Sequence, residues 1–297
     1  MAWRFEPGEK LPDAFRRVAT EEVARVEAGV KAKNANGAKA THEARQSFKR
    51  LRALLRLARP ALGADFEEES RRWREAGRRL AALRDGTILR ETFDRVVADS
   101  GNGLPANETS ILRAKVTLGR EATDSKEAQR ILRSVLGDLR GAKRRLATLN
   151  WPESLDDLSR GLRASQSRLR KSWRRARRDR TPEALHHWRK RVKDQSAQLR
   201  LLRIVAPQEA KARREVQKQV AEFLGDEHDL CLLAERLSCA AIPPKVEPVR
   251  TRLLEVVKKR RKALHRRAFK AAEVGHSEKP GAFAAVLSAA WKTASKE

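Results

Sequence analysis

A repeated pattern of residues constrains the fold of this chain more than any other feature. His42 and Arg45 recur 144 residues later as His186 and Arg189. The same offset joins further identical pairs without a gap: Lys49 with Lys193, Arg56 with Arg200, Leu80 with Leu224, Asp85 with Asp229 and Leu89 with Leu233. Because this offset is close to half of the 297-residue length, the whole chain is predicted to consist of two copies of one unit.

The spacing of apolar residues indicates that both copies are helical. Apolar positions recur every three or four residues, strand signals are almost absent, and prolines and glycines separate the stretches. We therefore expect an all-α protein. The expected helices are residues 11–33, 39–59, 64–83, 87–99, 106–149 with at least one break, 154–179, 182–205, 208–224, 228–240 and 246–273.

The charge balance predicts a polyanionic partner. Lys and Arg number 67 against 39 Asp and Glu, which gives a formal net charge of +28 that partners or counterions must neutralise. Hydrophobic residues make up 40% of the chain, so it can bury a core. No stretch approaches the ~18 apolar residues of a membrane span. The N-terminus also lacks the apolar run of a signal peptide, so we expect a cytoplasmic protein.

Each copy carries a helix face of one charge sign. At 100° per residue, the first copy gathers His42, Arg45, Lys49, Arg52 and Arg56 within about 80°. The second copy repeats this with His186, Arg189, Lys193 and Arg200. A solvated helix face usually mixes signs, whereas these faces contain no carboxylate, so we expect a bound anion. Further candidate phosphate contacts are Arg74, Arg78, Arg170, Arg174, Arg177, Arg214 and Lys218.

Metal binding and catalysis are the competing interpretations. The two repeated histidines could share a metal ion, but neither face supplies a second ligand three or four residues away. Phosphoryl transfer normally needs carboxylates to hold Mg²⁺ or a glycine-rich phosphate loop, and the sequence has neither on these faces. We therefore expect a binding protein that is not an enzyme and needs no cofactor or metal.

The paired motifs resemble those of the CHAD family, whose name stands for conserved histidine α-helical domain. The motifs are His-x-x-Arg-x-x-x-Lys-Arg-x-Arg at 42–52, His-x-x-Arg-Lys-x-x-Lys at 186–193, Leu-Arg-Asp at 83–85 and His-Asp at 228–229. The resemblance implies two tandem four-helix-bundle repeats, residues 8–150 and 154–290, related by a pseudo-twofold axis with a basic central cavity or pore. It also implies binding of inorganic polyphosphate and recruitment to polyphosphate granules.

Carried over by position, the resemblance assigns polyphosphate binding to nine residues. They are His42, Arg45, Lys49, Arg50, Arg52, His186, Arg189, Lys190 and Lys193. The second copy departs from the family pattern at Asp194, Gln195, Ser196 and His228, so we expect it to bind more weakly.

Nucleic acid is the second choice of partner. Single-stranded nucleic acids are usually held on exposed aromatic side chains, and this chain has no Tyr and only 5% aromatic residues. Duplex binders can rely on phosphate contacts alone, so a nucleic-acid-associated basic helical protein stays open, as does a granule scaffold.

Overall fold

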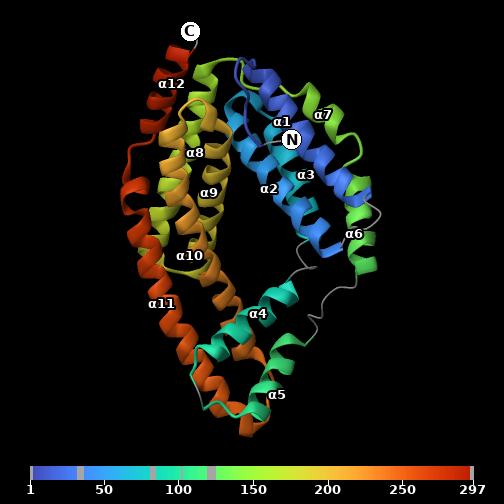
Figure 1. Ribbon diagram of the computed structural model, residues 1–297, viewed down its shortest axis with the longest axis vertical. Helices are drawn as coiled ribbons and strands as arrows, with labels where there is room; N and C mark the ends of the chain where they lie inside the picture. Colours follow the sequence, from blue (N-terminus) through green and yellow to red (C-terminus); the bar gives the residue numbers. More distant parts are fainter. Residues whose placement is uncertain (1–2, 32–36, 81–84, 102, 119–124, 295–297) are drawn as a thin grey trace.

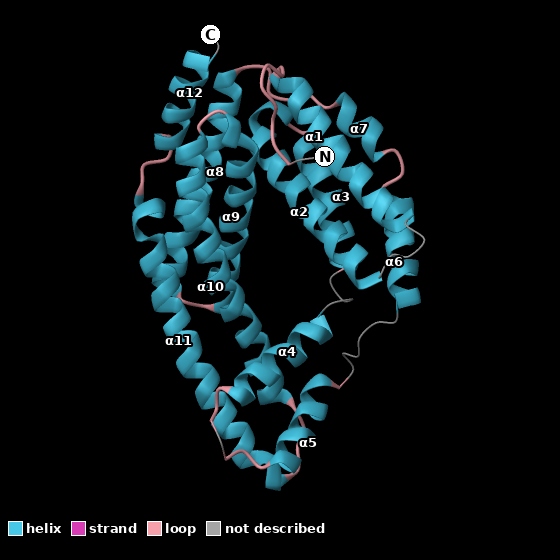
Figure 2. Ribbon diagram, viewed as in Figure 1, coloured by secondary structure: helices cyan, strands magenta, loops and turns pink. Residues whose placement is uncertain are grey.

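The computed structural model describes residues 3–31, 37–80, 85–101, 103–118 and 125–294. Within these ranges every regular element is a helix and none is a strand, so the predicted all-α class is confirmed (Figure 2). The first half contains α1 Leu11–Lys31, α2 Gly37–Leu62, α3 Asp65–Arg79, α4 Asp85–Ala98, α5 Ala106–Thr117, α6 Ser125–Asp138 and α7 Ala142–Thr148. The second half contains α8 Leu155–Asp179, α9 Pro182–Leu201, α10 Pro207–Cys239, α11 Glu247–Ser277 and α12 Ala282–Ala294.

Some predicted helix boundaries are wrong. Residues 208–224 and 228–240 were expected to form two helices, but α10 runs through both without interruption. A lone glycine at 225 costs a helix only about 1 kcal/mol, and Leu224 and Leu230 on either side are buried. The helix expected to end at residue 273 continues to Ser277, and α12 was not predicted.

Local capping sets both ends of α8 and the start of α9. The Ser154 hydroxyl accepts a hydrogen bond from the Asp157 backbone N–H at 3.1 Å, and the Asp157 carboxylate accepts one from the Ser154 N–H at 3.2 Å. This capping box begins α8. Arg180 ends it in a left-handed conformation with φ 51°, and Thr181 then caps α9. The two helices therefore pack closely side by side.

Buried apolar side chains form three clusters, and two of them join the halves of the chain. The first cluster fills the space between α1, α2, α3, α6 and α7 and extends to α8, α9 and α12. The second lies within α8, α9, α10 and α11 around Trp173 and Trp188. The third packs Phe93 of α4 and Leu112 of α5 against the end of α10 and the start of α11 (Figure 1). The two predicted units are thus tied together by core packing.

Helix α2 joins the first half to the second, since it packs against both α8 and α9. Gln198 of α9 is fully buried there, where its Nε2 donates to the Ala53 carbonyl of α2 at 3.0 Å and its Oε1 accepts from the Ser165 hydroxyl of α8 at 2.6 Å. Gly161 of α8 lies so close to α2 that an added Cβ would overlap the Leu57 carbonyl. The absence of a side chain at Gly161 therefore sets how closely the halves approach.

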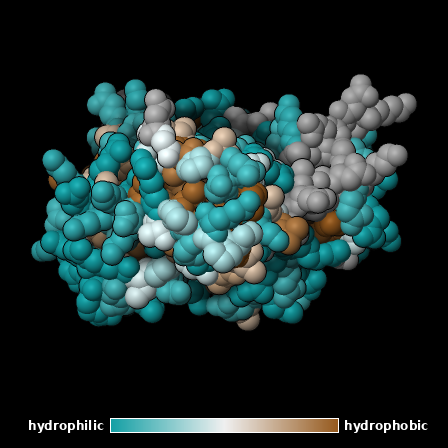
Figure 3. Space-filling model, turned by 90° about the horizontal axis from the view of Figure 1, so that it is seen from below, coloured by the Kyte–Doolittle hydropathy of each residue, from teal (hydrophilic) through white to brown (hydrophobic). Residues whose placement is uncertain are grey.

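The face seen from the α4–α5 end is mainly hydrophilic, with a smaller apolar area (Figure 3). Among the described helices, none is long and apolar enough to cross a membrane.

We expect Gly161→Ala to lower the free energy of unfolding by about 1–3 kcal/mol, because overpacking forces α8 away from the α2 backbone. Gly77→Ala in α3 is the matched control, since an added Cβ there meets nothing within 4 Å. Replacing this helical glycine should raise stability by up to about 1 kcal/mol. Urea unfolding followed by circular dichroism measures both. Equal effects of the two substitutions would contradict the close contact.

Candidate anion-binding site

The structure gathers cations from three helices beside the α2–α9 contact. We call Arg52 and Arg56 of α2, Arg74 and Arg78 of α3, and Lys190 and Arg191 of α9 the central cluster. Burial lowers the pKa of Arg52, and the charges of Arg74, Arg191 and Arg78 lower it further against the opposing charge of Asp194. Burial also lowers the pKa of Lys190, together with Arg52, Arg191, Arg56 and Arg78. Residues distant in sequence thus share one strongly positive region.

A buried ion pair holds the two motif helices together at this cluster. Arg56 Nη1 lies 2.8 Å from Asp194 Oδ1, with only 10% and 12% of the two side chains exposed. Arg191 Nη1 lies 3.3 Å from Asp194 Oδ2. Burial lowers the pKa of Arg56 to about 10, and burial raises the pKa of Asp194 against the effect of its arginine neighbours. Asp194 of the second copy therefore acts on an arginine of the first.

Several buried guanidinium donors in this region lack a protein acceptor. The Nε atoms of Arg52, Arg189 and Arg191 are each buried, with no hydrogen-bond partner among the described residues. A buried donor without an acceptor costs about 1–3 kcal/mol, so native structures seldom leave one unmet. Anion oxygens satisfy such donors well, because a guanidinium presents several N–H groups in the geometry of a phosphate or carboxylate.

A second cluster lies between α9 and α10. We call His186, Arg189, Lys193 and His228 the histidine cluster; the rings of its two histidines have centroids 4.6 Å apart. Burial and the charges of Lys190, His228, Arg189 and Lys193 lower the pKa of His186 to about 4. The His186 Nδ1 is buried without a partner among the described residues. Asp229 lies close enough to Arg189 to support its charge. Because Lys190 acts on His186, the histidine and central clusters adjoin.

The beginning of the α2 basic face makes contacts within the first half. Arg45 Nη1 donates to the Leu80 carbonyl at 3.0 Å and so holds the end of α3. His42 Nε2 lies 2.9 Å from the side-chain amide of Gln46. Lys49 is exposed on the same helix. Arg45 therefore has a structural contact in addition to its predicted role in binding.

Arg50 and Arg200 are a third group of cations from the two halves whose charges act on each other. Burial lowers the pKa of Arg200, as do Arg50, Arg214 and Arg203, while Glu22 opposes them. Arg50 Nη1 lies 3.2 Å from the buried carboxylate of Glu22. Residues 50 and 200 are the positions that correspond, at the 144-residue offset, to Asp194 and Arg56. The two pairs thus occupy equivalent positions in the repeat, but only one of them contains an aspartate.

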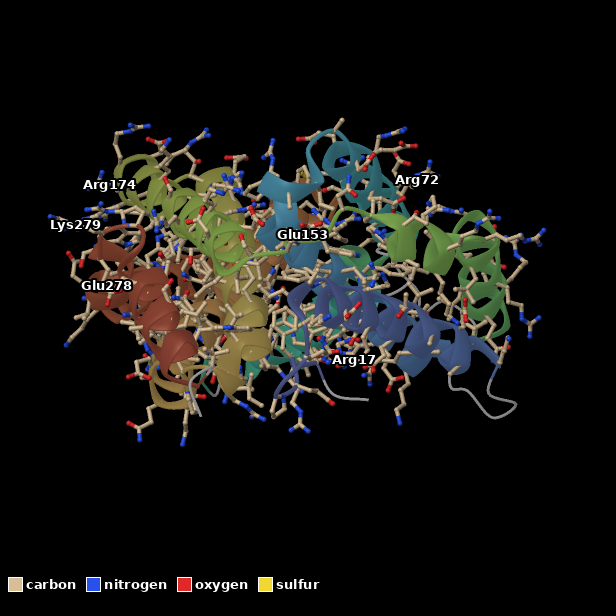
Figure 4. The ribbon with its side chains drawn as sticks, turned by 90° about the horizontal axis from the view of Figure 1, so that it is seen from above. Arg17, Arg72, Glu153, Arg174, Glu278 and Lys279 are labelled. Carbon is tan, nitrogen blue, oxygen red and sulfur yellow. The ribbon has the colours of Figure 1, made fainter. Side chains whose placement is uncertain are left out.

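Other predicted contacts lie elsewhere. Arg170, Arg174 and Arg177 of α8 border a hollow next to Ser277, at the end of α11. Figure 4 shows Arg174 at the outer edge of the molecule. Lys218 is exposed on α10. The predicted set is therefore divided between the α2–α9 region and the outer side of α8.

Sequence reasoning missed Arg191 and Arg168, which the structure adds to the central region. Burial lowers the pKa of Arg168, helped by Arg59 and Arg191. Arg191 falls about 100° from Lys190 around the helix, off the repeated face, so periodicity alone gave no signal for it. Among the described residues, no group of three or more His, Cys, Asp or Glu side chains could hold a metal ion.

Comparison with known protein families gives a match. A model of the CHAD domain matches residues 16–238, which include both motif helices and well over half of the chain. The chain belongs to the CHAD domain family. The matched span ends within α10, so α11 and α12 of this CHAD domain lie beyond it. A search of curated proteins finds no match.

We expect Asp194→Asn to destabilise this CHAD domain by about 3 kcal/mol, because it leaves the buried Arg56 without a counter-charge. The same substitution should strengthen anion binding, because it removes a negative charge from the central cluster. Asp179→Asn is the control, since Asp179 pairs with Arg175 and Arg178 at the surface and should change stability little. Urea unfolding and anion titration measure the two effects. An Asp194→Asn variant as stable as the wild type would refute the structural role of the pair.

The histidine cluster predicts a pH dependence of stability. His186 and His228 both have a folded pKa below the ordinary value of 6.5, and burial lowers the pKa of His187 and His276 as well. The unfolded chain therefore takes up protons that the folded chain does not as the pH falls, so the free energy of unfolding should fall from about pH 6.5 towards about pH 4. Urea midpoints at about pH 7.5 and about pH 5 measure this loss. His186→Gln should reduce it; a variant with an unchanged loss would count against the assignment.

Proposed function

We propose that this CHAD domain binds inorganic polyphosphate without acting on it chemically. The observation that carries the proposal is the central cluster, in which α2, α3 and α9 bring together cations whose charges lower one another's pKa. Its buried Nε donors on Arg52 and Arg191 have no acceptor among the described residues. A chain of phosphates supplies both the missing charge and the missing acceptors.

The placement of the aromatic side chains favours polyphosphate over single-stranded nucleic acid. Trp73 and Trp188 have no exposed surface, and Trp3, Trp151 and Trp173 are at most 4% exposed. Proteins that bind single strands without sequence preference stack bases on accessible rings. Polyphosphate has no bases, so cations suffice to recognise it. Duplex nucleic acid, held by phosphate contacts, is the alternative occupant.

The composition of the central cluster supports binding without catalysis. Enzymes that transfer phosphoryl groups place carboxylates where they can hold Mg²⁺ against the phosphates. Asp194 contributes a carboxylate here, but it is buried and paired with Arg56 and Arg191. Asp194 therefore serves to hold α2 against α9.

The arrangement of the two halves is part of the proposal. We infer two tandem four-helix-bundle repeats around a pseudo-twofold axis, with the cations lining a central cavity. The Arg56–Asp194 ion pair and the electrostatic influence of Arg50 on Arg200, at equivalent positions of the repeat, support this symmetry. Action in the cytoplasm, at polyphosphate granules, follows from the same proposal.

A competition titration tests the proposed ligand. Labelled polyphosphate bound to the protein at physiological salt should resist displacement by RNA or duplex DNA at equal phosphate concentration. Its affinity should fall steeply with added salt, because binding neutralises phosphate charges and releases counterions. Ready displacement by either nucleic acid would favour the alternative.

Variants locate the binding in the central cluster. Replacing Arg52, Arg78 and Lys190 with Ala should weaken polyphosphate binding by at least about tenfold, since charge-assisted contacts to phosphate are lost. Replacing the exposed Arg133, Arg144 and Lys245 with Ala removes the same number of charges outside the three helices of the cluster and is the control. Equal losses in the two variants would show that only net charge matters.

A further inference from the structure

The outer side of α8 carries a basic groove separate from the central cluster. One hollow of about 400 Å³ is lined by Arg170, Trp173, Arg174, Arg177, Arg178 and Ser277. A second, of about 360 Å³, shares Arg177 and extends along α11 past Lys262, Arg266 and Lys270. The two hollows adjoin at Arg177, between α8 and α11, and together we call them the outer groove. From residue 170 to 180 this part of α8 spans about 15 Å.

The groove and the central cluster lie on opposite sides of α8. Arg168 faces the central region, since Arg59, Arg191 and Asp194 all act on its charge. Arg177 follows nine residues later, which is two and a half helical turns, and therefore points the opposite way. Figure 4 likewise shows Arg174 at the outer edge of the molecule. A ligand in one site thus cannot contact the other without passing around the helix.

Buried donors in the groove lack acceptors, as they do in the central cluster. Trp173 is only 4% exposed, and its indole Nε1 has no hydrogen-bond partner among the described residues. The Arg170 Nε beside it is also buried without one. These two unmet N–H donors lie beside a hollow bordered by three further arginines, a setting suited to an anion with several oxygens, such as a phosphate group.

Aromatic rings hold the groove's arginines in place. The Arg177 guanidinium lies 5.7 Å from the Trp173 ring and the Arg180 guanidinium 5.9 Å from the Phe269 ring. The rings therefore support cations rather than stack bases. Glu273 pairs with Arg177 at 3.0 Å, but both side chains are more than half exposed. Such a surface pair contributes little, so a phosphate can displace the carboxylate.

We propose that the outer groove is a second phosphate-binding site, through which one protein molecule holds two polyphosphate chains at once. The inference rests on the proposed function for the choice of ligand. The groove's α11 wall lies beyond residues 16–238, so it is a feature of this chain outside the matched CHAD span. A protein with phosphate sites on opposite sides of one helix bridges chains instead of coating a single chain.

Calorimetric titration with tripolyphosphate, too short to reach both sites, tests the proposal on the full chain. The wild type should bind two molecules per protein. Replacing Arg174, Arg178 and Lys270 with Ala should leave one, as should the central Arg52, Arg78 and Lys190 variant, while the exposed Arg133, Arg144 and Lys245 control should keep both. Trp173→Phe retains the ring but removes the donor, and should weaken the outer site about tenfold.

Bridging is measured separately, by energy transfer between long polyphosphate chains labelled with donor and acceptor dyes. Wild-type protein should bring the dyes together, and the groove variant should not. A groove variant that still binds two tripolyphosphates and still bridges overturns this inference but leaves the proposed function intact. A wild type that binds no tripolyphosphate overturns both. Loss of RNA binding alone in the groove variant would assign the groove to nucleic acid and refute the proposal.

Discussion

Repulsion between like charges is the constraint on which the architecture of this protein depends. The α2–α9 contact brings Arg52, Arg56, Lys190 and Arg191 into a half-buried region where their charges act on one another. Such an arrangement opposes folding unless other contacts hold the helices in place. Asp194 offsets part of the repulsion, and the Gln198 hydrogen bonds to α2 and α8 fix the geometry.

Apolar packing supplies the remaining stability, and it is placed away from the charges. The three core clusters lie within and between the helix groups, so the cationic faces do not have to contribute to the core. The close approach of α8 to α2 at Gly161 adds direct backbone contact between the halves. The protein can therefore keep a strongly positive region in a fixed shape without a ligand. A site of that kind binds with little loss of conformational entropy.

Much of the fold could be predicted from the sequence because helical periodicity and breaking residues are local signals. The prediction failed at Gly225, where packing on both sides of α10 outweighs the weak helix preference of one residue. The repeated faces of α2 and α9 were visible because they recur at a fixed offset. The meeting of Arg56 with Asp194 was not visible, since it depends on how two distant helices pack. In the sequence, Asp194 only replaces the cation that the first copy has at Arg50. In the structure, its carboxylate links α9 to α2 through Arg56.

The third core cluster gives the chain an interlocked topology. Phe93 and Leu112 belong to the first half, yet they are buried against Leu233 and Leu253 of the second. A first half produced alone would expose this α4–α5 surface to water, and the second half would lose the cover of its α10–α11 end. Two identical subunits that exchange a helical arm bury surface in the same manner. Residues 149–154 join the two halves covalently. The packing of one half on the other therefore does not depend on protein concentration, as the association of two separate chains would.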